Sequence, residues 1–169
     1  MATINNLDTK DTLTAHIFKI FEEIRTKLIQ EGGIDNLPLD FPIVEMEPCA
    51  EMSNYLGMCH FAVCVDKDEP KRLRQIVDRI SMRVLCKPSN SAAEGEEIHF
   101  HLLRLIPTLL HELAHVTTEL HRSHAGSDTS NWSNRKLKRL DHSDHDELFY
   151  EQFRRILKAA ELLGIYSLP

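Results

Sequence analysis

The chain has 169 residues, of which 42% are hydrophobic and 27% charged, as in a globular domain and unlike a disordered or membrane-embedded chain. We therefore expect a single domain over residues 1–169, with its core between about 11 and 165. The formal net charge of -6 argues against a surface built as a whole to neutralise phosphates.

The hydrophobic runs of the chain are short. The stretch 102–110 is interrupted by Arg104 and Pro107, and it falls short of the roughly 20 residues that a membrane-spanning helix needs. The first residues show no basic stretch followed by an apolar one, as a secretory signal would. The sequence thus predicts an intracellular protein, in the cytoplasm or nucleus, without a membrane partner.

The first third of the chain combines one helical pattern with two strand patterns. Apolar residues recur at three- and four-residue steps from Leu13 to Leu28, and a pair of glycines follows, which predicts an amphipathic helix and its end. Short strands are expected at 41–46 and 56–65.

The segment 69–84 mixes two patterns. Its apolar residues over 73–80 stand three or four positions apart, which predicts a helix in its first part. Strand character follows at 82–86. Proline, serine, asparagine and glycine then predict a loop at 87–96.

The segment 98–120 is apolar on nearly all sides, as expected of a central helix. Its beginning is ambiguous, because 97–102 alternates well enough to form a strand. Pro107 either occupies the first turn of a helix that begins near Ile106 or kinks a longer one. Both readings leave 109–120 helical.

Polar residues dominate 121–141, which predicts a long polar loop inserted in the domain. A last helix is expected at 143–163, with Gly164 in the stop position. The succession of helices and strands indicates the α+β class. The polar loop also carries a basic group through which DNA is a candidate partner: Arg135, Lys136, Lys138 and Arg139.

The most specific motif is His-Glu-Leu-Ala-His, which begins at His111. Residues four apart on a helix lie on the same face, so His111 and His115 can share one metal ion. Glu112 lies on the adjacent surface, where it can act as a general base without binding the metal. Imidazole ligands and an open position favour Zn²⁺.

A catalytic zinc site needs a third protein ligand, for which five residues are candidates: His121, His124, His142, His145 and Glu147. His145 is favoured, because its spacing from Phe149 and Ile156 places it on the apolar stripe of the expected last helix. The nearby acidic residues Asp141, Asp144 and Asp146 have two interpretations. One of them accepts a hydrogen bond from the second ring nitrogen of a histidine ligand, or they stabilise the start of the last helix.

The alternative third ligand is His121, ten residues after His111. It requires the helix to end abruptly between the two, and no glycine is available there. Glu147 aligns with the polar face of the last helix, so we expect it to be solvated or to lie at the helix start.

The sequences TLLHELAH (108–115) and HDELF (145–149) together resemble the WLM and SprT (Spartan) zinc metallopeptidases, and the likeness covers roughly residues 55–155. The resemblance implies a zincin-like fold, in which a small mixed or antiparallel sheet packs on the HExxH helix between N- and C-terminal helices. It also implies that His111, His115 and His145 bind zinc and that Glu112 is the base. Members of both families are implicated in degrading proteins crosslinked to DNA.

The expected activity is zinc-dependent hydrolysis of peptide bonds in a protein or peptide substrate. A strand at 82–86 or 97–102 is expected to pair with the extended substrate. Candidate donors to the oxyanion are Tyr150, Tyr166 and His142. Two alternatives remain: a zinc-stabilised interaction module without turnover, and a metallohydrolase of a non-peptide amide.

Overall fold

A computed structural model describes residues 6–46, 56–69, 73–84, 94–122, 132–139 and 145–167. In this part of the chain three helices and four strands follow one another in the order α1 (Asn6–Gln30), β1 (Ile43–Glu45), β2 (Gly57–Asp66), β3 (Leu73–Met82), α2 (Glu94–Arg122), β4 (Trp132–Arg139) and α3 (Glu147–Leu162). The predicted α+β class is confirmed.

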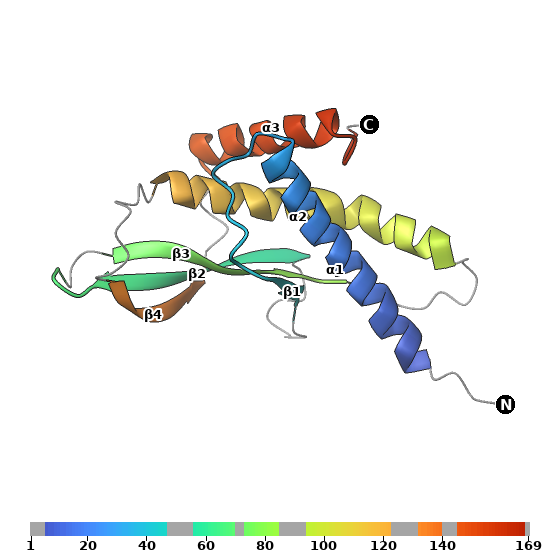
Figure 1. Cartoon of the computed structure of the whole chain (residues 1–169), viewed down its shortest axis with the longest axis horizontal. Helices are drawn as coiled ribbons and strands as arrows, with labels where there is room; N and C mark the ends of the chain where they lie inside the picture. Colours follow the sequence, from blue (N-terminus) through green and yellow to red (C-terminus); the bar gives the residue numbers. More distant parts are fainter. Residues whose placement is uncertain are drawn as a thin grey trace.

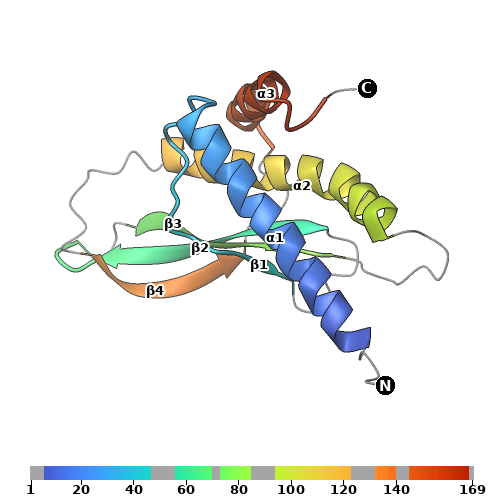
Figure 2. The ribbon, with the colours of Figure 1, turned by 45° about the vertical axis from the view of Figure 1, so that its right-hand side comes forward.

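The four strands form one mixed sheet in the order β1-β3-β2-β4. β1 runs parallel to β3, whereas β2 is antiparallel to both of its neighbours. Helix α2 lies across one face of the sheet and contacts the two central strands, β2 and β3 (Figure 1). Helix α3 packs on α2, and α1 crosses α2 and reaches β1 (Figure 2).

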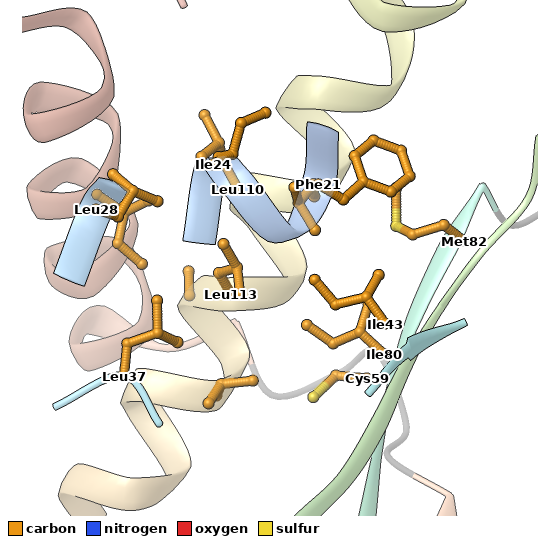
Figure 3. Close-up of a cluster of buried hydrophobic side chains, with 14 of the residues drawn as sticks. Phe21, Ile24, Leu28, Leu37, Ile43, Cys59, Ile80, Met82, Leu110 and Leu113 are labelled. Carbon is orange, nitrogen blue, oxygen red and sulfur yellow. The ribbon is translucent and has the colours of Figure 1, made fainter. Parts of the chain in front are cut away.

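Side chains from all these layers meet in one hydrophobic core (Figure 3). Leu110 and Leu113 of α2 are fully buried in it, beside Phe21 and Leu28 of α1. Burial of a side chain of this size contributes about 1.5–3 kcal/mol. Leu110 directly precedes the His-Glu-Leu-Ala-His motif and Leu113 is its central residue, so the core fixes the part of α2 that carries the motif.

Strand β3 corrects the prediction of a helix in the first part of 69–84. Phe61 of β2 pairs with Val77 and His60 pairs with Arg79, so β3 carries an extra residue at this point. Such a bulge shifts the alternation of side chains. Val77 and Ile80 therefore both pack on the core, although they are three residues apart. This spacing resembles that of a helix, which is why the prediction was wrong.

Helix α2 spans Glu94–Arg122 and contains Pro107. Of the two alternatives for this proline, the longer helix is therefore correct, and the helix that begins near Ile106 is not. The helical prediction for 98–120 is confirmed, and the alternative strand at 97–102 is wrong. The predicted loop at 87–96 is wrong at its end, where residues 94–96 are already helical. No helix among the described residues is long and apolar enough to cross a membrane.

The predicted polar loop at 121–141 is also wrong in part, because residues 132–139 form β4 and residues 121–122 end α2. The four basic residues named above lie on β4. This strand pairs with β2 and stands at the end of the strand order. Lysine and arginine are common on edge strands, where they discourage pairing with other chains, and they hide the alternation by which a strand is recognised.

The last helix is confirmed, with Gly164 at a left-handed φ of 69° in the stop position. The helix begins at Glu147 rather than at 143, because the side chain of Asp146 accepts a hydrogen bond from the backbone N–H of Phe149 at 3.0 Å. Asp146 is thus the N-cap, and His145 precedes the helix instead of lying on it.

Candidate metal centre

Three histidines converge at the start of α3, two from α2 and one that directly precedes α3. The Nε2 atoms of His111 and His115 lie 3.2 Å apart, and those of His115 and His145 lie 3.1 Å apart. Ligand atoms of all three residues lie within 4.8 Å of one another. The three side chains are therefore close enough to bind one metal ion.

The local sequence explains this convergence. His111 and His115 are one helical turn apart on α2, and their ring centroids lie 4.9 Å apart. The Asp146 cap fixes where α3 begins and so fixes the residue before it. The ring of His145 stacks on that of His115 at a centroid distance of 4.9 Å and an interplanar angle of 29°.

The two Nε2 separations that involve His115 fit a tetrahedral ion. Ligand bonds of about 2.0–2.1 Å at tetrahedral angles place two ligand nitrogens about 3.3–3.4 Å apart, close to the observed 3.1 and 3.2 Å. In one tautomer of the neutral imidazole Nε2 is the acceptor nitrogen, and in this form the three Nε2 atoms can bind a metal ion. A bound cation would accept a lone pair from each of them.

Glu112 lies on the side of α2 that faces strand β2. It is only 3% exposed, and the backbone N–H of Cys59 donates a hydrogen bond to its carboxylate. Its Oε2 atom is buried and has no hydrogen-bond partner among the described residues. Burial raises the pKa of this carboxyl group to about 8, although the Cys59 N–H lowers it in part. Glu112 is thus a strongly perturbed carboxyl group next to His111 in the chain.

Gly57 lets α2 approach β2 at this point. A Cβ atom at position 57 would lie 2.8 Å from Cγ2 of Thr108, 3.1 Å from Cγ of Glu112 and 3.1 Å from Sδ of Met82. Real Cβ atoms essentially never lie below 3.0 Å from such neighbours. The glycine therefore sets how close the Glu112 side chain comes to the sheet.

The backbone places two of the other candidate ligands, His121 and Glu147, on helices. α2 continues to Arg122, so His121 lies ten residues along a continuous helix from His111, which is about 15 Å of helix rise. Glu147 is exposed in the first turn of α3, as predicted. His124, His142, Asp141 and Asp144 lie outside the described residues.

Two of the candidate oxyanion donors, Tyr150 and Tyr166, lie at opposite ends of α3. Tyr150 is 50% exposed, and its ring centroid lies 6.3 Å from that of His145. Tyr166 follows the far end of α3 and borders a small cavity with Leu103 and Ile106. Of the strand candidates for substrate pairing, 97–102 is helical, and the described part of 82–86 contains only the last residue of β3.

Sequence reasoning missed two aromatic residues of the site. Phe149 lies on the predicted apolar stripe of the last helix and Phe153 follows one turn later, and both rings also contact imidazoles of the cluster. The four-residue step from His145 to Phe149 was the signal that could have revealed this packing. The apolar stripe of the last helix predicts packing in the hydrophobic core, and it gives no sign of contact with the metal ligands.

No family model, curated protein or solved structure matches the chain. The resemblance to the WLM and SprT metallopeptidases therefore stays a prediction.

Proposed function

We propose that the protein is an intracellular zinc-dependent endopeptidase with a zincin-like fold, related to the WLM and SprT metallopeptidases. The observation that carries the proposal is the convergence of the Nε2 atoms of His111, His115 and His145. The buried carboxylate of Glu112 next to the first histidine is the second support. A metal that served structure alone would have no need of this carboxylate.

In this proposal His111, His115 and His145 hold the zinc ion through Nε2. When bound there, zinc would acidify a water ligand and polarise the carbonyl of the substrate. Glu112 would accept the proton of the attacking water at Oε2, its oxygen without a described partner, and pass it to the leaving amine. The hydrogen bond from the Cys59 N–H would keep the carboxylate oriented during this transfer.

Zinc is proposed because the donor set consists of three imidazoles, and three histidines with one open position form a known type of catalytic zinc site. The partly exposed rings of His111 and His145 support an open position, since neither is sealed in the core. A protein or peptide substrate is proposed because a helical His-Glu-x-x-His motif is typical of metalloproteases.

Proteins associated with DNA, or crosslinked to it, are the substrate class that we propose first. The support is the basic sequence of β4, Asn-Arg-Lys-Leu-Lys-Arg, on a strand that pairs with β2. β2 also supplies the N–H that contacts Glu112. Phosphate contacts made by this strand would weaken steeply with salt.

The test measures zinc by elemental analysis in wild type, His145→Ala and His121→Ala, and cleavage of an unfolded protein in wild type and Glu112→Gln. We expect near-stoichiometric zinc that is lost only in His145→Ala, and cleavage that disappears in Glu112→Gln. A wild type without zinc contradicts the proposal. Zinc without cleavage would favour an interaction module, and cleavage of small amides alone would favour a non-peptide hydrolase.

A further inference from the structure

Phe149 lies against all three imidazoles of the metal centre. Its ring centroid is 4.4 Å from that of His145, 4.5 Å from that of His115 and 5.0 Å from that of His111. The ring stacks on His145 at an interplanar angle of 20° and meets His111 nearly edge-on at 60°. The side chain is 1% exposed.

The arrangement limits the freedom of each imidazole. A histidine ring turns about a terminal torsion that has no sharply staggered minimum, so its neighbours decide its orientation. Aromatic pairs favour offset-stacked and edge-to-face geometries at these centroid distances. Because one fixed ring contacts three imidazoles, a rotation of any of them loses an aromatic contact with Phe149.

Phe153 and Ile156 do not share this position. Phe153 contacts the ring of His111 at a centroid distance of 5.5 Å, and it is only partly buried. Ile156 is fully buried on α3, but it is seven residues, or about 10 Å of helix rise, beyond Phe149. Comparing Phe149 with Ile156 therefore separates the effect of contact with the imidazoles from the effect of burial on α3.

We propose that Phe149 is a positioning residue that holds His111, His115 and His145 in the orientation in which their Nε2 atoms converge. The inference deepens the proposed function, because it concerns the same site. At many metal centres, groups that hydrogen-bond to the ligands hold them in orientation, and loss of such a group lowers metal affinity roughly 10- to 100-fold. Here the aromatic contacts of Phe149 have that role.

The test compares Phe149→Leu with Ile156→Ala, using zinc affinity by competition with a chromophoric chelator and the visible spectrum of the cobalt(II) form. We expect Phe149→Leu to lose roughly 10- to 100-fold in zinc affinity and to change the cobalt spectrum. Ile156→Ala should lower the melting temperature and leave both metal readouts as in wild type. Unchanged readouts in Phe149→Leu, or equal losses in Ile156→Ala, would overturn the inference.

A second measurement needs no bound metal. In metal-free wild type, the face of the Phe149 ring should shift the C–H protons of the stacked His145 imidazole upfield in the NMR spectrum, and Phe149→Leu should abolish the shift. Its absence in wild type overturns the inference even if Phe149→Leu fails to fold. A wild type that binds neither zinc nor cobalt contradicts the proposed function, and the NMR shift still decides the role of Phe149.

Discussion

The Nε2 atom of His145 lies 3.1 Å from the Nε2 atom of His115, which precedes it by 30 residues in the chain. The two residues lie in different parts of the fold, since His115 is on α2 and His145 directly precedes α3. A metal ion bound between them joins these elements only in the folded state. Metal binding must therefore be coupled to stability.

The first prediction is that zinc raises the melting temperature of the metal-free protein. Free zinc at 100 times its dissociation constant stabilises the native state by about 2.7 kcal/mol, which corresponds to roughly 5–10 °C for a domain of this size. His115→Ala should remove the shift. The control is His16→Ala, because His16 is exposed on α1. An equal shift in His115→Ala would show that zinc binds elsewhere.

The second prediction concerns pH and Glu112 in metal-free protein. Burial raises the pKa of this carboxyl group from 4.5 to about 8, so the native state holds the proton more tightly than the unfolded chain does. Stability should therefore fall as pH rises from about 4.5 to about 8. Glu112→Gln removes this loss, because the amide does not titrate.

Denaturant unfolding of both proteins in the presence of a chelator measures the effect. The gain of Glu112→Gln over wild type should grow with pH and reach a few kcal/mol, on the order of 1.4 kcal/mol per pH unit. Added zinc should reduce the gain, since a nearby cation favours the ionised carboxylate. Stability curves that run parallel over this pH range would contradict the prediction.

The third prediction is that Gly57→Ala disturbs the contact of α2 with β2. The added methyl group would lie 2.8 Å from Cγ2 of Thr108 and 3.1 Å from Cγ of Glu112. Overpacking of this kind costs typically about 1–3 kcal/mol. Denaturant unfolding should show this loss, and cleavage should fall because Glu112 moves.

Thr108→Ala tests the cause, because it removes the nearest of the clashing atoms. The double variant should recover part of the stability that Gly57→Ala loses, measured as the coupling energy of a double-mutant cycle. Strictly additive losses would show that the close approach of Thr108 is not the origin of the effect.

The motif on α2 was the part of the site that the sequence predicted best. The i, i+4 spacing of His111 and His115 depends only on helix geometry, and the helix itself was predicted correctly. Local spacing also placed Phe149 on an inward face. Its contacts with three imidazoles were not predictable in the same way, because they depend on how α3 packs on α2.

The sheet shows where local patterns fail. The extra residue on β3 lies between Val77 and Arg79, where these residues pair with Phe61 and His60 of β2, so the apolar spacing on β3 imitates a helix. On β4 the basic residues hide a strand that is recognisable only by its pairing with β2. In both cases the deciding interaction lies between residues far apart in sequence.

The last prediction concerns the Asp146 cap, which precedes Phe149 and follows His145. Asp146→Ala removes the acceptor of the Phe149 N–H and should cost about 0.5–2 kcal/mol of stability. Because the cap fixes where α3 begins, zinc affinity should fall as well. Asp146→Asn is the matched control, since asparagine caps helices about as well as aspartate. Thermal unfolding and zinc competition check both variants, and wild-type affinity in Asp146→Ala would show that the cap does not position His145.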